Sequence, residues 1–164
     1  MKRFIYYTII LLSVFSCKNT EEKTSITTSK RGLISNNAMV VSARQEASKI
    51  GVDILKKGGN AFDAMAATGL ALAVAYPFAG NLGGGGFMVY RQANGDIGGI
   101  DYREKAPLAA TKNMYLDDTG NVIPEKSTHG ALAVGIPGSI AGIFVVHEKL
   151  GMLPLKDILE PVIA

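Results

Sequence analysis

The 164-residue chain has one cysteine, two histidines and no tryptophan. A single cysteine excludes an internal disulfide, and two histidines that lack cysteine partners or an H-x-x-x-H spacing form no recognisable metal site. The chain also has no G-x-G-x-x-G sequence and no Gly-Lys-Ser/Thr sequence, which argues against a nucleotide site. With 48% hydrophobic and 19% charged residues, the remaining composition is that of one globular domain.

Basic residues are not in excess outside the first segment of the chain. The formal net charge is +3, but residues 1–31 hold six Lys/Arg and two Asp/Glu, which leaves eleven basic and twelve acidic side chains in residues 32–164. No basic surface remains for a phosphate backbone, and we therefore expect no nucleic-acid partner.

The first 16 residues have the pattern of a signal peptide. Lys2 and Arg3 precede an uncharged run over 4–15, which is too short to span a bilayer. The sequence Val-Phe-Ser-Cys at 14–17 resembles a bacterial lipoprotein signal, in which Cys17 would be lipidated, although Phe15 is bulkier than usual there. We expect an exported protein, periplasmic or at the cell surface and lipid-anchored to a bacterial membrane. An ordinary secretory signal with an unrelated thiol is the alternative.

Residues 17–37 are predicted to combine the lipidated Cys17 with a disordered tether. The stretch from 18 to 31 is polar, rich in Thr and Ser, and too poor in apolar residues to form a core. The globular part is expected to cover 38–164, with no internal repeat.

Two helices are predicted in the first half of this globular part. The first has Ser42 as its N-cap, ends at Gly58-Gly59, and has one apolar face; the face consists of Ala47, Ile50, Ile54 and Leu55. Asn60 caps the second, which carries no charge from 64 to 79 and is ended by Pro77. At roughly a dozen residues it is shorter than the about 20 that a membrane span needs, so we interpret it as a buried core helix.

A β-hairpin is predicted next, between strands at 87–90 and 97–102. Asn94-Gly95 lies between them, and both residues tolerate the positive φ of a two-residue turn. Apolar residues alternate onto both faces of the first strand, which predicts a sheet covered by helices on both sides and a layered arrangement with antiparallel pairing.

The later elements are predicted from weaker patterns. A strand and a Pro-Gly turn are expected over 131–138, followed by a helix over 140–150 that Ser139 caps. His147 is expected to be a partly exposed residue of this helix. The last ten residues read as a helix in progress without a capping signal, which suggests truncation.

Four consecutive glycines at 83–86 are costly to order, so the fold must require them. An anion-binding loop is one explanation, but these glycines follow a helix and lead into a strand, the reverse of a phosphate loop. Close approach of the backbone to other backbone, or to a substrate pocket, is the favoured explanation.

Four segments in order resemble one family, the γ-glutamyltranspeptidases. They are GGNAFDA at 58–64, GGGGFM at 83–88, DYREKAP at 101–107 and AVGIPGS at 133–139. The resemblance implies an α+β fold, the N-terminal nucleophile hydrolase-like four-layer αββα sandwich, of which this chain is only the N-terminal part of the large subunit.

The resemblance also implies a function. Family members are self-cleaving precursors that transfer the γ-glutamyl group of glutathione and related compounds to water, or to an amino acid or peptide. Their nucleophile is a Thr that begins the C-terminal small subunit, so no catalytic residue is expected in this chain, and neither a metal nor another cofactor is implied. Two alternatives stay open: a non-catalytic, lipid-anchored binding or structural domain, and a family member that acts on another acyl group, such as a cephalosporin side chain.

Arg103 is the candidate substrate-binding residue. In the family, the Arg of the matching segment holds the α-carboxylate of the substrate, and a guanidinium can do so through two parallel hydrogen bonds. Asp101 and Glu104 are expected to orient the loop. Thr128, followed by His129, resembles the family's nucleophile segment, but the AVGIPGS segment follows it instead of preceding it, so Thr128 is predicted to be a loop residue.

Overall fold

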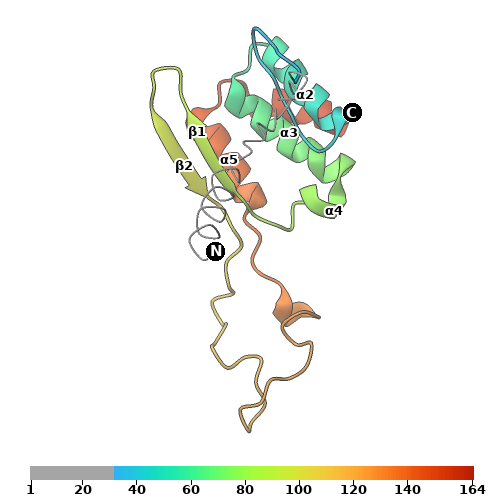
Figure 1. The fold of residues 1–164 in the computed structure, drawn as a ribbon, viewed down its shortest axis with the longest axis vertical. Helices are drawn as coiled ribbons and strands as arrows, with labels where there is room; N and C mark the ends of the chain where they lie inside the picture. Colours follow the sequence, from blue (N-terminus) through green and yellow to red (C-terminus); the bar gives the residue numbers. More distant parts are fainter. Residues whose placement is uncertain (1–31) are drawn as a thin grey trace, which may run out of the picture. The chain divides into compact units, whose positions relative to one another are not determined.

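The computed structural model describes residues 32–164 (Figure 1). The expected signal peptide at 1–16 and the expected lipidation site at Cys17 lie outside the described residues. The chain divides into two units, Met1–Ile34 and Ser35–Ala164. All the helices and strands described below belong to the second unit.

The predicted first helix is α2, Gln45–Lys56, and its buried face includes Ala47 and Ile54. Its N-cap is Arg44 instead of Ser42, so that part of the prediction is wrong. The Ser42 hydroxyl donates to the Arg44 carbonyl oxygen at 2.8 Å and also lies 2.8 Å from the Ser48 hydroxyl. These contacts hold Ser42 in a turn before the helix, where it cannot act as a cap.

Helix α3, Ala61–Ala75, begins as predicted at the Asn60 cap. The Asn60 side chain accepts from the N–H groups of Phe62 and Asp63 at 2.9 and 3.0 Å, and Asp63 accepts from the Asn60 N–H at 2.9 Å. This reciprocal pair is a capping box. Because α2 and two later helices, α5 (Ser139–Leu150) and α6 (Leu155–Ile163), all pack against α3, its uncharged sequence is largely buried.

Pro77 ends α3 and opens the short helix α4, Pro77–Gly80. Among the residues that the structure describes, no helix combines the length and hydrophobicity needed to cross a membrane. The core lies between α3 and its neighbouring helices and includes the side chains of Ile54, Leu70, Ile143 and Ile158.

Helices α5, Ser139–Leu150, and α6, Leu155–Ile163, complete the helical part. Ser139 is the first residue of α5 and makes no capping hydrogen bond, so its predicted role is wrong; Gly138 is the N-cap. The Ser139 N–H donates to the Gly84 carbonyl oxygen at 3.0 Å, which ties the helix start to the glycine segment.

Strands β1, Phe87–Arg91, and β2, Ile97–Asp101, form the predicted antiparallel hairpin, with Phe87 paired to Asp101. Its turn differs from the prediction. The Gln92 N–H donates to Asp96 O at 2.7 Å, which leaves a three-residue loop in which only Gly95 has a positive φ, +97°. A glycine in this conformation is typical of a three-residue hairpin loop.

Helices do not cover both faces of this hairpin within the described residues, so that prediction is wrong for them. Met88 and Tyr90 are half-buried, and the Tyr90 ring meets Phe62 edge-on at 5.5 Å between centroids. On the other face, Phe87, Val89 and Ile97 are 66%, 89% and 78% exposed. The fold is therefore mixed helix and sheet, with one apolar sheet face uncovered.

A long loop leads from β2 to α5 (Figure 1). The strand predicted over 131–138 is absent: Ala131–Ala133 form a 3-10 turn, and Ile136 makes an isolated two-way bridge to Lys105 with N–H···O distances of 2.8 and 3.1 Å. One bridge is too little pairing to define a strand.

Candidate functional site

The candidate site is the segment that follows strand β2. The Asp101 carboxylate accepts a hydrogen bond from the Arg103 N–H at 3.0 Å, so it orients the loop, as expected. Side-chain to backbone bonds of this kind, two residues apart, are typical of Asp in turns. They fix the backbone on which the Arg103 side chain is mounted.

The Arg103 guanidinium is accessible, because its side chain is 65% exposed. The Arg103 Nε lies 3.9 Å from a Glu104 carboxylate oxygen, and its Cζ lies 5.6 Å from the centre of the Phe87 ring. An exposed ion pair of this length contributes little, while the aromatic face adds a modest attraction for the cation. The guanidinium therefore keeps hydrogen-bond donors available for an anionic ligand.

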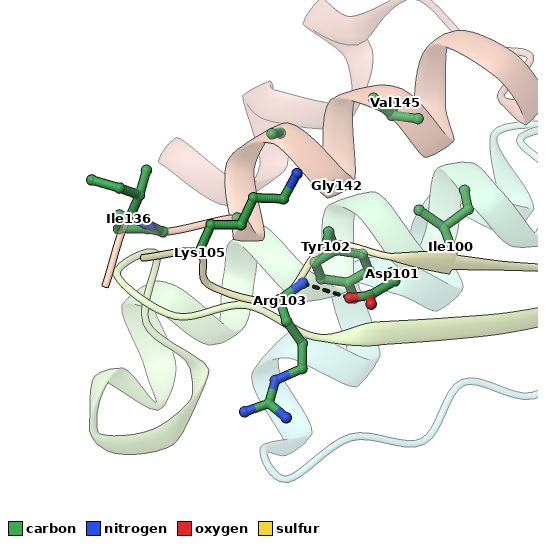
Figure 2. A pocket seen from close by; sticks show the side chains of 11 residues that line it. Ile100, Asp101, Tyr102, Arg103, Lys105, Ile136, Gly142 and Val145 are labelled. Carbon is green, nitrogen blue, oxygen red and sulfur yellow. Dashed lines mark hydrogen bonds between the residues drawn. The ribbon is translucent and has the colours of Figure 1, made fainter. Parts of the chain in front are cut away.

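A hollow of about 340 Å³ lies beside this segment. Its lining residues include Ile100, Ile136 and Val145. Figure 2 shows that the Lys105 ammonium points toward the start of helix α5, whereas the Arg103 guanidinium extends in another direction, away from α5. The two cations therefore face different surroundings.

Close backbone approach accounts for one glycine of the run at 83–86. A Cβ on Gly85 would lie 2.7 Å from the Arg103 Cα and 2.7 Å from the Tyr102 carbonyl oxygen, distances that real Cβ atoms do not show. The Gly84 carbonyl oxygen also accepts from the Gly138 N–H at 2.9 Å. The favoured explanation, close backbone approach, is confirmed for Gly85. A Cβ on Gly86 would instead lie 2.9 Å from the Tyr102 ring, and a Cβ on Gly84 would make only an ordinary contact, 3.6 Å from Glu104 Oε1.

A polar cluster that the sequence analysis missed lies at the other end of the helices. Asp63 is fully buried, and its carboxylate accepts from the N–H groups of Met152 and Leu153 at 3.1 and 3.3 Å. The His147 Nε2 lies 2.8 Å from Leu153 O and 3.8 Å from Asp63 Oδ1. His147 thus makes tertiary contacts, and its side chain is 16% exposed. The Asn60-x-x-Asp63 spacing could have indicated the capping box, but it could not reveal that Asp63 also lies close to His147.

Thr128 is an exposed loop residue, as predicted. Its hydroxyl donates to Glu125 O at 3.1 Å and lies 3.0 Å from the His129 Nδ1. Within residues 32–164, no group of three His, Cys, Asp or Glu side chains could hold a metal ion.

Comparison with known proteins decides the family. The model of the Gamma-glutamyltranspeptidase family matches residues 47–164, which include Arg103 and the glycine segment. The chain belongs to the γ-glutamyltranspeptidase family. The resemblance seen in the four sequence segments is confirmed.

Individual γ-glutamyltranspeptidase relatives agree. A glutathione hydrolase proenzyme of Pseudomonas sp. (strain A14) is 56% identical over 127 residues, which cover 77% of this chain and 22% of the relative. The chain thus spans about a fifth of the length of the curated relatives it matches.

Solved structures also superpose on the chain. The γ-glutamyltranspeptidase of Helicobacter pylori is 48% identical, has a TM-score of 0.76, and is matched over 80% of this chain and 38% of that chain. A cephalosporin acylase from Bacillus halodurans is 27% identical, with a TM-score of 0.64, over 82% of this chain and 26% of that chain.

Proposed function

We propose that the chain is the N-terminal part of a γ-glutamyltranspeptidase that cleaves the γ-glutamyl amide of glutathione and related compounds. The observation that carries this proposal is membership of the family across residues 47–164, together with relatives named glutathione hydrolase proenzyme. The acceptor of the glutamyl group is water, an amino acid or a peptide amine.

The proposed reaction has two steps. A Thr hydroxyl located beyond Ala164 attacks the γ-carbonyl carbon, an ester to Thr forms, and the C–N bond breaks as the leaving amine takes up a proton. Water or an acceptor amine then attacks this ester, which restores the Thr hydroxyl. The groups that form and break these bonds all belong to the proposed C-terminal small subunit, and this chemistry needs no metal or nucleotide.

Arg103 is proposed to bind the α-carboxylate of the glutamyl donor. Its exposed guanidinium, its weak pairing with Glu104 and the fixed backbone beneath it all support this role. A carboxylate can accept two parallel, charge-assisted hydrogen bonds from one guanidinium, a geometry that a lysine ammonium cannot reproduce.

The uncovered sheet face supports the finer proposal about the fold. Phe87, Val89 and Ile97 form an apolar surface that a soluble sheet would bury. In the proposed four-layer αββα sandwich, a second sheet formed with the C-terminal small subunit packs against this surface. Two sheets packed face to face lie about 10 Å apart, which leaves room for these side chains to interdigitate.

Export and lipid anchoring are part of the proposal and rest on residues 1–17. Metabolic labelling of the full-length protein with a palmitate analogue tests them: label should appear in the membrane fraction and be lost in Cys17→Ser. Label retained by Cys17→Ser would contradict lipidation at this residue.

The similarity to a cephalosporin acylase favours one second candidate, cleavage of another acyl amide by the same kind of nucleophile. Assaying glutaryl or adipyl amides beside γ-glutamyl amides separates the two substrate classes, because neither alternative acyl group carries the α-amino group of glutamate. Faster turnover of an acyl amide without that group would favour the second candidate.

The main experiment measures release of nitroaniline from γ-glutamyl-p-nitroanilide by the full-length protein and by Arg103→Lys. We expect turnover by the wild type and a KM raised at least roughly 30-fold in the variant, which corresponds to about 2 kcal/mol. Arg44→Lys is the matched control, since Arg44 is exposed and pairs only with Glu46 at 3.6 Å in the described structure. An unchanged KM for Arg103→Lys would contradict the assigned role, and no turnover by the wild type would support a non-catalytic domain.

A further inference from the structure

We propose that Tyr102 is a positioning residue, held by a cradle of glycines, that fixes the direction in which Arg103 leaves the strand. The glycine cradle is Gly85, Gly86, Gly138 and Gly142. The effect on substrate binding rests on the function proposed above. The effect of Tyr102 and the glycines on the position of the Arg103 backbone does not.

The Tyr102 ring is enclosed by two glycines from different elements. A Cβ on Gly86 would lie 2.9 Å from the ring, and a Cβ on Gly142, a buried residue of helix α5, would overlap it, with 2.6 Å to Cδ2. Any side chain at either glycine would displace the ring. Tyr102 therefore fits between the start of β1 and helix α5 only because the residues facing it there, Gly86 and Gly142, have no side chains.

The backbone beside Arg103 is held in the same way. A Cβ on Gly85 would lie 2.7 Å from the Arg103 Cα and 2.8 Å from the Glu104 nitrogen. A Cβ on Gly138 would overlap the Tyr102 carbonyl group and lie 3.1 Å from the Arg103 carbonyl oxygen. The Arg103 Cα is thus packed against Gly85, and the Arg103 carbonyl oxygen against Gly138, which fixes the direction of the Arg103 Cα–Cβ bond.

Hydrogen bonds join these three segments into one unit. The Tyr102 N–H donates to Gly86 O at 3.0 Å, and the N–H groups of Gly138 and Ser139 both donate to Gly84 O, at 2.9 and 3.0 Å. The glycine segment is therefore bonded to the segment that carries Arg103 and to the first turn of α5. A shift in any of the three would move the others.

The Arg103 and Lys105 side chains diverge (Figure 2). The fixed Arg103 backbone sets where the side chain starts, and the guanidinium lies over the Phe87 ring and away from helix α5. Bidentate binding of a carboxylate depends on the position of the whole guanidinium plane, and a displacement of about 1 Å can lower the rate roughly 100-fold.

The test compares two neighbouring glycines in the full-length protein. Gly85→Ala would press on the Arg103 backbone, whereas a Cβ on Gly84 meets nothing closer than Glu104 Oε1 at 3.6 Å, an ordinary contact. We expect Gly85→Ala to raise KM for γ-glutamyl-p-nitroanilide at least about 10-fold with kcat within about threefold. We also expect faster backbone amide exchange over 102–105. Gly84→Ala should change neither quantity.

A second pair of variants covers the case in which Gly85→Ala does not fold. Tyr102→Phe keeps the ring and should retain the wild-type KM and amide exchange. Tyr102→Ala removes the ring and should raise KM and accelerate exchange at 103 and 104. A purely structural role would instead lower the yield of active protein without changing the KM of the active fraction.

The comparison of each variant with its control decides the inference. Equal KM and equal amide exchange in Gly85→Ala and Gly84→Ala, or in Tyr102→Ala and Tyr102→Phe where Gly85→Ala does not fold, would overturn the inference. If the wild type does not hydrolyse the γ-glutamyl substrate, the proposed function fails, and the exchange comparison alone decides whether the glycine cradle fixes the Arg103 backbone.

Discussion

Replacing the buried Asp63 by alanine should destabilise the helical part more than replacing a surface or loop carboxylate does. Asp63 is fully buried at the N-terminus of α3. Its Oδ2 accepts from Asn60 N at 2.9 Å, Met152 N at 3.1 Å and Leu153 N at 3.3 Å. Alanine leaves these three donors without their acceptor and removes the hydrogen bonds from α3 to the loop between α5 and α6.

The magnitude follows from the number of donors. A buried donor left unpaired costs about 1 to 3 kcal/mol. Because Met152 is 73% exposed, water can replace part of what is lost, so the lower value applies. Three donors then give a loss of about 3 kcal/mol in the free energy of unfolding. Asp63→Asn keeps one carbonyl oxygen for the same donors and should lose about 1 kcal/mol.

Urea denaturation of the full-length protein, followed by far-UV circular dichroism, measures this difference. Asp118→Ala is the control, since Asp118 is an exposed residue of the long loop. The reasoning is refuted if Asp63→Ala unfolds within 1 kcal/mol of the wild type, or if Asp63→Asn is the more damaging of the two changes.

The remaining predictions concern two surface carboxylates and the hairpin turn. A hydrogen bond from Lys49 lowers the pKa of Asp53 below its ordinary 3.8, and hydrogen bonds led by the Thr119 hydroxyl lower the pKa of Asp117 below the same value. Each therefore contributes stability that is present above pH 3.8 and lost as the pH falls through the lowered folded value. Carboxyl NMR titration should show both pKa values below 3.8, with 1 M salt raising that of Asp53 and leaving that of Asp117 nearly unchanged; an equal salt response would contradict the assigned causes. Gly95→Ala should cost about 1 kcal/mol, because φ is +97° there, and Asn94→Ala less; the reverse order in thermal unfolding would contradict the assignment of the strain to Gly95.

The proposed site could be located from the sequence because its signal is a contiguous motif. Arg103 stands in the segment DYREKAP, and Asp101, two residues earlier, holds its N–H as expected. The importance of Tyr102 could not be predicted in this way. Its ring and backbone meet Gly86, Gly138 and Gly142, which come from segments far apart in the chain.

The sequence by itself determined the elements whose signals are local. The Asn60 cap, the termination at Pro77 and the hairpin around Gly95 each depend on side-chain or backbone preferences within a few residues, and all three are where the sequence predicted them.

Tertiary structure decided the rest, because the competing interactions come from distant segments or from packing. Helix α5 starts one residue earlier than predicted, where the N–H groups of Gly138 and Ser139 both donate to Gly84 O, so Ser139 lies inside the helix instead of capping it. The strand expected over 131–138 is reduced to one bridge with Lys105. His147 contacts Leu153 and Asp63 only because α5 and α6 pack against α3. Whether a sheet face is covered likewise depends on what packs against it, which the pattern of apolar residues along one strand cannot specify.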